Sequence, residues 1–367
     1  MGKYASGGDE PIVDKIRVAV IAAGGIAQVA HIPGYQKIAG VELVAICDTN
    51  ETKLAYVKEK FGISLGLTDY RRVLDMKDVD AVSICAPNYL HAPMAIDAMQ
   101  AGKHVICEKP ICSTGKAAKA ILATASQTGK IFMGAFVQRF SKNSMFLKSL
   151  IDDGKFGQIY YAKGGYMRRR GIPGLNGWFT SKACEGGCMA DIGVHALDRM
   201  FWLMGSPEPV AVMGKVYQKF AAQAIDGGWP PPETRVGEIY DGVNDVDDMA
   251  QGYVRFADGR TLLVEACWAS HAPGVSYMQL YGTDCGALEG DSGLQLFGEL
   301  AKEEVDLTPK VPHQEDGYTA ELRHFVDCIR TGKPPITTPA EILAVARIIE
   351  GIYKSSETGR EVLISEL

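Results

Sequence analysis

A turn near the start of the chain has the residue types that hold the pyrophosphate of a dinucleotide. Residues 17–28 read RVAVIAAGGIAQ, which indicates a strand, a glycine turn and the first residues of a helix. Backbone N–H groups and the helix dipole bind phosphates at such a turn, and glycine allows the close approach. The residues that we expect to form this site are Ala23, Gly24, Gly25, Ile26 and Ala27.

One position of the turn departs from the G-x-G-x-x-G pattern of dinucleotide sites. Gly24 holds the second position and Ala27 the third, where alanine is allowed, but Ala22 stands in the first. The extra methyl group is tolerated if the φ angle of Ala22 is negative. We therefore expect an altered turn geometry without loss of binding.

A carboxylate at the end of the second apolar run supports the same site. Asp48 lies 21 residues after Ala27 and directly follows VELVAIC. In that place it accepts hydrogen bonds from the adenosine ribose and repels a 2′-phosphate. The sequence DTNETK that begins at Asp48 contains no arginine to bind that phosphate. NAD is therefore the expected cofactor rather than NADP, although Asp48 is also consistent with a helix cap.

The elements that must position these residues alternate in type. Short apolar runs at residues 16–23, 41–47, 80–86, 103–108 and 131–136 are separated by segments of helical periodicity. This alternation predicts a doubly wound parallel sheet, a Rossmann domain at residues 16–135. Gly62, Gly102 and Gly129 follow helical segments, where a C-terminal glycine belongs.

The pattern changes after residue 135 and predicts a second, α+β domain at residues 136–367, with an open, largely antiparallel sheet. A hairpin is expected at residues 248–270, with its reversal at Asp258-Gly259. Residues 218–247 contain few apolar residues and predict a long surface loop, for which we consider a position over the site. An open sheet leaves a large apolar face bare, so we expect a homodimer or homotetramer.

Composition and charge narrow the classes of function. The chain has 367 residues and a net charge of -6, which disfavours a nucleic-acid partner. We expect no membrane partner, because no run of 18 apolar residues occurs, and residues 1–15 are interpreted as a flexible tail. The nine cysteines include no CxxC pair, which favours reduced thiols and a cytoplasmic location.

Two further motifs connect the chain to a known family. Residues 86–110 read APNYLHAPMAIDAMQAGKHVICEKP, and residues 185–198 read EGGCMADIGVHALD. The E-K-P tripeptide and the D-x-G-x-H segment, in this order behind a dinucleotide-binding half, resemble the Gfo/Idh/MocA family of sugar oxidoreductases. The resemblance covers nearly the whole chain after residue 15.

The resemblance implies roles for individual residues. Lys109, Asp191 and His195 correspond to the catalytic group of the family and are also expected to bind substrate. Beside the cofactor, the resemblance implies the P-N-x-x-H element and the glutamate of E-K-P, which are Pro87, Asn88, His91 and Glu108, together with Lys109.

These residue types suit the oxidation of a secondary alcohol. A histidine removes a proton effectively near pH 7, and a lysine cation stabilises alkoxide character, so His195 is the expected base and Lys109 its electrostatic partner. Asp191 lies four residues before His195, so on a helix it would share that face and orient the ring or bind a hydroxyl group. With Asp198 the pair would also suit a metal, but no third ligand cluster is evident and no metal is expected.

Further candidates for the substrate wall follow predicted strands. Strand alternation places Arg168 and Arg170 on one face, toward an anionic or hydroxyl-rich substrate, and Arg169 on the other; a surface basic run is the alternative. Tyr166 and Trp178 are candidate sugar-stacking rings, with core or loop packing as the alternative. Gln138 and Arg139 are expected to line the cleft, although Arg139 also suits a structural ion pair.

These observations predict an NAD-dependent oxidoreductase that acts on a secondary hydroxyl group of a sugar, sugar derivative or cyclitol, with a small carbohydrate as its substrate. A redox-assisted glycoside hydrolase is the alternative: it oxidises, eliminates, hydrates and re-reduces without net NADH. That reaction needs extra acid-base groups, for which Tyr166, Glu265 and His271 are candidates. A non-catalytic cofactor-binding regulator is a third class.

Overall fold

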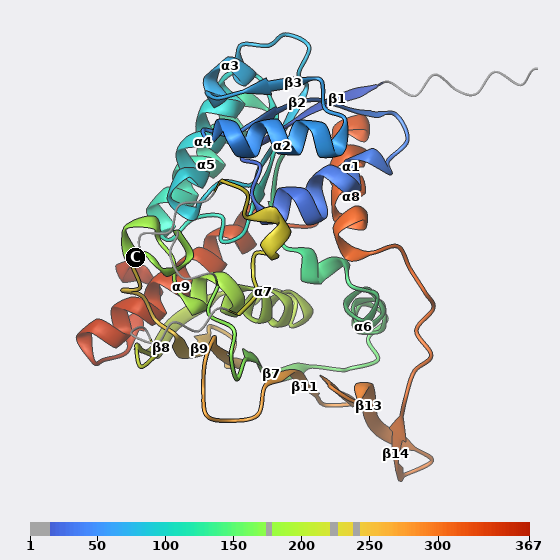
Figure 1. Ribbon diagram of the computed structural model, residues 1–367. Coiled ribbons are helices and arrows are strands. Elements are labelled where there is room, and N and C mark those ends of the chain that lie inside the picture. Colours follow the sequence, from blue (N-terminus) through green and yellow to red (C-terminus); the bar gives the residue numbers. More distant parts are fainter. Residues whose placement is uncertain (1–14, 174–177, 221–226, 238–242) are drawn as a thin grey trace, which may run out of the picture.

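The computed structural model describes residues 15–173, 178–220, 227–237 and 243–367. The tail expected at residues 1–15 therefore lies outside the described residues, apart from Lys15. The six-stranded N-terminal sheet and the larger C-terminal sheet belong to two domains, with helices between them (Figure 1).

A six-stranded parallel sheet forms the N-terminal domain, in the order β3-β2-β1-β4-β5-β6. Its strands are β1 (Ile16–Ile21), β2 (Val41–Cys47), β3 (Leu65–Leu67), β4 (Ala81–Ile84), β5 (His104–Glu108) and β6 (Phe132–Ala135). Such a sheet is buried on both faces, which is why its strands are continuous apolar runs. The doubly wound parallel sheet is confirmed, and only the three-residue β3 was too short to be predicted.

Helices follow the strands of this sheet. They are α1 (Ile32–Gln36) with the preceding π-turn η1 (Ala27–His31), α2 (Glu51–Phe61), α3 (Tyr70–Leu74), α4 (Asn88–Gln100) and α5 (Gly115–Thr128). Gly62 and Gly129 end α2 and α5 with φ angles of 68° and 65°. These left-handed C-caps confirm the predicted helix ends.

The second sheet has nine strands in the order β14-β13-β12-β11-β7-β10-β9-β8-β15, and all its pairings are antiparallel except β7 with β10. Its strands are β7 (Ile159–Met167), β8 (Pro209–Tyr217), β9 (Met249–Phe256), β10 (Thr261–Cys267), β11 (Val275–Gly282), β12 (Cys285–Gly290), β13 (Gly293–Leu300), β14 (Glu303–Leu307) and β15 (Val362–Leu363). The predicted open, largely antiparallel sheet is confirmed, as is the β9–β10 hairpin, where Gly259 has a φ of 87°.

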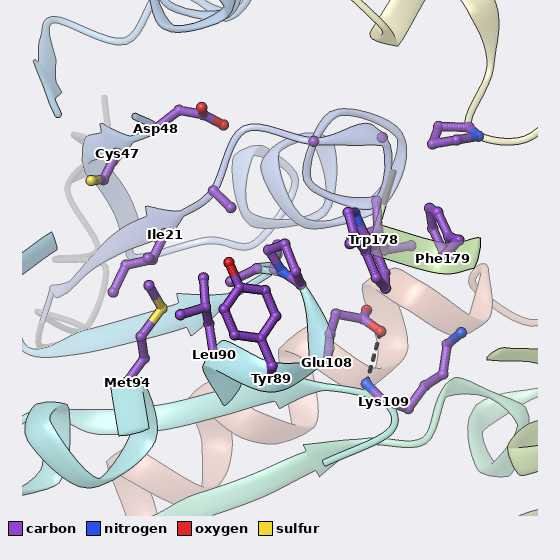
Figure 2. A pocket seen from close by; sticks show the side chains of 18 of the residues that line it. Ile21, Cys47, Asp48, Tyr89, Leu90, Met94, Glu108, Lys109, Trp178 and Phe179 are labelled. Carbon is purple, nitrogen blue, oxygen red and sulfur yellow. Dashed lines mark hydrogen bonds between the residues drawn. The ribbon is translucent and has the colours of Figure 1, made fainter. Parts of the chain in front are cut away.

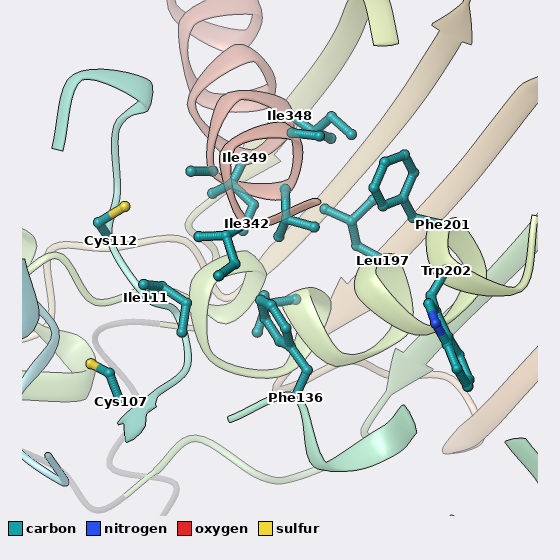
Figure 3. Close-up of a cluster of buried hydrophobic side chains, with 14 of the residues drawn as sticks. Cys107, Ile111, Cys112, Phe136, Leu197, Phe201, Trp202, Ile342, Ile348 and Ile349 are labelled. Carbon is teal, nitrogen blue, oxygen red and sulfur yellow. The ribbon is translucent and has the colours of Figure 1, made fainter. Parts of the chain in front are cut away.

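Helices cover one face of this sheet. Helices α7 (Val194–Leu203) and α9 (Pro339–Thr358) contact its strands, and α6 (Lys142–Asp152) packs against α7. Figure 3 shows Phe201 of α7 and Ile349 of α9 in a cluster that also contains Cys107 and Phe136 from the end of the first domain. One continuous apolar core therefore fixes the two domains against each other.

A C-terminal helix returns to the first domain. Helix α8 (Gly317–Thr331) packs beside the Rossmann sheet, against α1 (Figure 1). Leu322 and Phe325 are fully buried in the same cluster as Val18 and Ile32. Residues far apart in the chain thus complete the N-terminal core and bring the start of α8 to the space between the domains.

Candidate active site

A single cavity of about 1100 Å³ runs between the two domains. Figure 2 shows Asp48 at one end of it and Lys109, Trp178 and Phe179 toward the other. The carboxyl ends of β1, β2, β4 and β5 supply one wall, where ligands bind in open parallel sheets. The same cavity is lined by residues of the predicted dinucleotide turn and by the predicted catalytic residues.

The glycine turn lies at the Asp48 end. Gly24, Gly25 and Ile26 line the cavity, and a Cβ atom on Gly24 would meet nothing within 4 Å. The backbone at Gly24 is therefore open to a ligand, and this turn fits a pyrophosphate. Ala23 and Ala27 are fully buried beneath it and are not among the residues that line the cavity.

Asp48 holds the turn in place as well as lining the cavity. Its Oδ2 accepts a hydrogen bond of 2.8 Å from the N–H of Ala23, and its Oδ1 accepts one of 2.8 Å from the N–H of Asn50. The N–H of Ala23 is thus already used. The helix cap of α2 is Asn50, whose side chain accepts from the N–H of Lys53 at 3.0 Å, so the alternative that Asp48 caps the helix is wrong.

The backbone at Ala22 differs from the expectation. Its φ is 72°, in the left-handed region, whereas tolerance of the methyl group was argued for a negative φ. The conformation is the one that glycine in the pattern would adopt freely. The alanine turn therefore keeps the glycine geometry at an energetic cost.

Part of the predicted surface loop crosses above this turn. Trp229 and Pro230 line the cavity, and a Cβ atom on Gly25 would lie 2.5 Å from Cβ of Pro230. The Gln28 side chain donates to the carbonyl of Thr234 at 3.2 Å, and Asn50 donates to the carbonyl of Gly237. Residues 227–237, one described part of the predicted loop, thus lie over the site as considered from the sequence.

The P-N-x-x-H element is divided between the wall and the interior. Pro87 lines the cavity, whereas Asn88 and His91 are buried and are not among its lining residues. Asn88 donates to the carbonyl of Glu185 at 2.8 Å, and the His91 ring lies 2.7 Å from the carbonyl oxygens of Ala86 and Pro110. These two side chains hold neighbouring loops together behind the cavity wall.

Glu108 is the last residue of β5; it lines the cavity and forms an ion pair with His31. Its Oε1 lies 2.9 Å from Nε2 of His31, and its Oε2 accepts from the N–H of Lys109 at 3.1 Å (Figure 2). Burial raises the pKa of Glu108, but the hydrogen bond and charge of His31 and the charge of Lys109 lower the pKa by more, so the net shift is downward. Glu108 is therefore an anion with a partner behind the wall.

Lys109 and Asp191 meet across the domain boundary. The Lys109 ammonium donates to the Asp191 carbonyl at 2.8 Å and to its Oδ1 at 3.1 Å, while Trp268 donates to Oδ2 at 3.0 Å. Asp191 lies in a π-turn, η5 (Met189–Gly193), directly before α7. Within the described residues the Asp191 carboxylate thus bonds to Lys109 and Trp268 and not to His195, so of its two expected roles it does not orient the His195 ring.

His195 lines the same cavity with no charge partner. Its Nδ1 is buried and has no hydrogen-bond partner among the described residues. Burial and the positive charges of Lys109 and Arg168 hold the pKa of His195 well below its usual 6.5. The imidazole is therefore neutral at pH 7, the form in which it accepts a proton.

The remaining substrate candidates separate clearly. Gln138, Tyr166, Arg168 and Trp178 line the cavity. Arg139 does not: it is fully buried and pairs with Asp198 at 2.6 Å and Glu341 at 2.9 Å, which corrects its assignment and explains Asp198 without a metal. The candidates Glu265 and His271 for the glycosidase alternative are also not among the cavity-lining residues.

Arg170 is corrected as well. Strand β7 ends at Met167, so the alternation assumed for Arg168 and Arg170 stops before it can apply. Arg170 is exposed and is not among the lining residues.

Sequence reasoning missed several aromatic residues of the wall, among them Tyr318 and Phe179. Tyr318 reaches it from the start of α8, far along the chain, and Phe179 stacks on Trp178 with ring centroids 3.7 Å apart. Nothing in the local sequence marks Tyr318, whereas the adjacent aromatic pair at residues 178–179 was a usable signal.

The fold and cavity define a two-domain enzyme with a dinucleotide site, and comparisons with known proteins agree. Residues 16–136 match the oxidoreductase family with an NAD-binding Rossmann fold, and residues 148–364 match the C-terminal alpha/beta domain of the same family. The chain belongs to the Gfo/Idh/MocA oxidoreductase family, as the sequence motifs predicted.

Relatives cover nearly the whole chain. D-glucoside 3-dehydrogenase of Escherichia coli is 29% identical, over 95% of this chain and 97% of its own. A D-xylose 1-dehydrogenase (NADP(+)) of Haloferax volcanii is 26% identical, over 94% of this chain and 98% of its own. The structure of a levoglucosan dehydrogenase with NADH and L-sorbose superposes with a TM-score of 0.82, at 24% identity over 96% of this chain and 99% of that chain, and shares its fold.

Two further findings concern the described part of the chain alone. Its helices include none that is long and apolar enough to cross a membrane. Within the same residues, no group of three or more His, Cys, Asp or Glu side chains is arranged to hold a metal ion.

Proposed function

We propose that the protein is an NAD-dependent oxidoreductase that acts on a secondary hydroxyl group of a sugar, sugar derivative or cyclitol. One observation carries this proposal: Lys109, Asp191 and His195 line the same cavity as the dinucleotide turn. The sugar dehydrogenases among the relatives support the substrate class.

The bound nicotinamide supplies the acceptor for a hydride. The chain supplies the acid-base and electrostatic groups around the reacting hydroxyl. His195 is neutral and takes the hydroxyl proton, while the Lys109 ammonium stabilises the negative charge that develops on the oxygen. Asp191, anchored by Trp268, keeps the ammonium in place through two hydrogen bonds.

The preference for NAD over NADP rests on Asp48. Its carboxylate is held at the cavity wall by the N–H groups of Ala23 and Asn50, so it cannot easily turn away from a 2′-phosphate. A fixed anion repels a second anion at short distance. The NADP-dependent relative makes this preference a point for direct measurement.

We also propose a homodimer or homotetramer that forms through the sheet face opposite α7 and α9. That face presents Tyr253 and Met213, which is 56% exposed, and the paired rings of Tyr161 and Tyr281. A monomeric mass in light scattering at micromolar concentration would contradict this part of the proposal.

A substrate screen tests the activity. Sugars, cyclitols, uronates and aryl glycosides are offered with NAD, and NADH absorbance and released aglycone are followed separately. NADH formation on a polyol or sugar supports the proposal. Release of aglycone without net NADH would replace it with the glycoside hydrolase, and nucleotide binding without any turnover would leave a regulator.

A further inference from the structure

Three consecutive arginines have different surroundings. Arg168 lines the substrate end of the cavity, whereas Arg169 and Arg170 are exposed and are not among its lining residues. All three arginines follow the end of β7 at Met167, and only Arg168 reaches the cavity.

The Arg168 side chain is held in one place. Its guanidinium lies 4.7 Å from the centre of the Tyr166 ring, and its Nη1 donates to the carbonyl of Gly171 at 3.2 Å. A Cβ atom on Gly171 would lie 2.4 Å from Cδ of Arg168, so only glycine leaves room for this arrangement. The guanidinium is therefore positioned before substrate binds, which reduces the entropy lost on binding.

The charges around Arg168 are otherwise balanced. Glu108 pairs with His31 at 2.9 Å, and Lys109 pairs with Asp191 at 3.1 Å. Arg168 takes part in no ion pair with a carboxylate of the described chain. This end of the cavity therefore carries one positive charge that lacks an anion, and a partly buried cation is stabilised by one.

We propose that the substrate is an acidic sugar, such as a uronate or a glycosiduronate, and that Arg168 binds its carboxylate. This inference rests on the proposed oxidoreductase function and names its substrate class. A planar guanidinium matches a carboxylate through paired hydrogen bonds. A phosphate group carries close to two charges and would need a second cation, so a carboxylate is the better match.

Matched substrate pairs test the inference. The measurement is kcat/KM with NAD for glucuronate against glucose, galacturonate against galactose, and methyl glucuronide against methyl glucoside, with glucose 6-phosphate added. The acid of each pair is expected to react roughly 10- to 100-fold better, the range for charge-assisted hydrogen bonds. A clear preference for glucose 6-phosphate over glucuronate would overturn the choice of a carboxylate.

Variants assign the preference to one side chain. Arg168→Gln is expected to lower kcat/KM for each acid about 10- to 100-fold more than for its neutral partner, whereas Arg169→Gln, the exposed neighbour, retains the preference. NAD affinity by calorimetry verifies that each variant is folded. If Arg168→Gln fails this check, Arg168→Lys keeps the charge without the planar fork and is expected to lose part of the preference.

Two results would overturn the inference while the proposed function stands: neutral sugars oxidised as well as their acids, or equal losses on both in Arg168→Gln. If no sugar of either kind reduces NAD, the proposed function itself fails. In that case, calorimetric titration of glucuronate and glucose into the NADH-loaded protein decides the inference, because glucuronate must bind more tightly if Arg168 recognises a carboxylate.

Discussion

The two ends of the cavity are built from different parts of the chain. At the dinucleotide end the backbone of the turn at Gly24 and Gly25 forms part of the wall, and the Asp48 carboxylate both lines the cavity and fixes that turn. At the substrate end the wall consists of functional groups, with Lys109 after β5 and His195 on α7. A backbone site is sensitive to added atoms, whereas a side-chain site depends on individual groups.

The largest effect is expected from removing single groups at the substrate end. Lys109→Ala and His195→Ala should each lower kcat strongly, because proton removal is worth about 100- to 10,000-fold and an electrostatic donor roughly 100- to 1,000-fold. NAD affinity, measured by calorimetry, should stay near normal because neither residue belongs to the turn. Arg169→Ala is the control and should retain activity. Full activity in His195→Ala would refute its assignment as the base.

At the dinucleotide end, replacing Asp48 is expected to change the preference for NAD over NADP. Asp48→Ser with Asn50→Arg removes the repulsive charge and adds an attractive one, so the ratio of NADP to NAD affinity should rise roughly 10- to 100-fold. Calorimetric titration with each nucleotide measures it. Glu51→Gln, which removes an exposed carboxylate from the same segment, is the control and should leave the ratio unchanged. Equal affinity for both nucleotides in the unmodified protein would contradict the role of Asp48.

An added methyl group tests the backbone character of this end. Gly25→Ala places a Cβ atom 2.5 Å from Cβ of Pro230, so the turn or the loop above it must move. We expect NAD affinity to fall about tenfold, the cost of about 1.4 kcal/mol. The double variant with Pro230→Gly removes the opposing atoms and should recover part of the affinity. A Gly25→Ala protein that binds NAD normally would show that the loop does not constrain the turn.

The contrast between the ends also explains what the sequence could predict. The parallel sheet and the turn depend on local order, so the alternation of runs and the place of Asp48 were sufficient. Lys109 and His195 were identified through motifs of a known family. The residues of the dinucleotide turn lie close together in the chain, and the catalytic residues lie in recognisable motifs, so both could be found from the sequence.

Long-range packing decided what the sequence could not predict. Arg139 follows a strand that ends at the cleft, yet Asp198 and Glu341 from distant helices enclose it. Tyr318 reaches the wall only because α8 returns to the first domain. The His91 ring lies in the interior, 2.7 Å from two backbone carbonyl oxygens, a place that its position near a helix start does not reveal.

A smaller effect is expected in the pH dependence of kcat/KM, which reports on the charged groups of the substrate end and not on the dinucleotide turn. His195 must be neutral to accept a proton, and its pKa lies well below 6.5, so oxidation should lose activity only at pH values below 6.5. Arg168→Gln removes one of the charges that lower this pKa, so the acid limb of kcat/KM should move upward. Profiles measured on the best substrate at saturating NAD provide the comparison. An acid limb above pH 6.5 in the unmodified protein would contradict a neutral His195.

The smallest effect concerns the cost of the alanine in the turn. Ala22 has a φ of 72°, and an L-residue in this region costs roughly 1–2 kcal/mol. Glycine removes that cost, but it also increases the conformational entropy of the unfolded chain, which destabilises the folded protein by about 0.4–1 kcal/mol. Ala22→Gly should therefore increase the free energy of unfolding by about 1 kcal/mol, measured by urea denaturation.

The neighbouring alanine separates this backbone effect from a general effect of glycine. Ala23 is fully buried and is not among the residues with positive φ, so Ala23→Gly loses packing and gains nothing in conformation. It should destabilise the protein by about 1 kcal/mol, opposite in sign to Ala22→Gly. If both variants destabilise equally, the left-handed turn is not costly at Ala22, and the dinucleotide end tolerates an added methyl group there without strain.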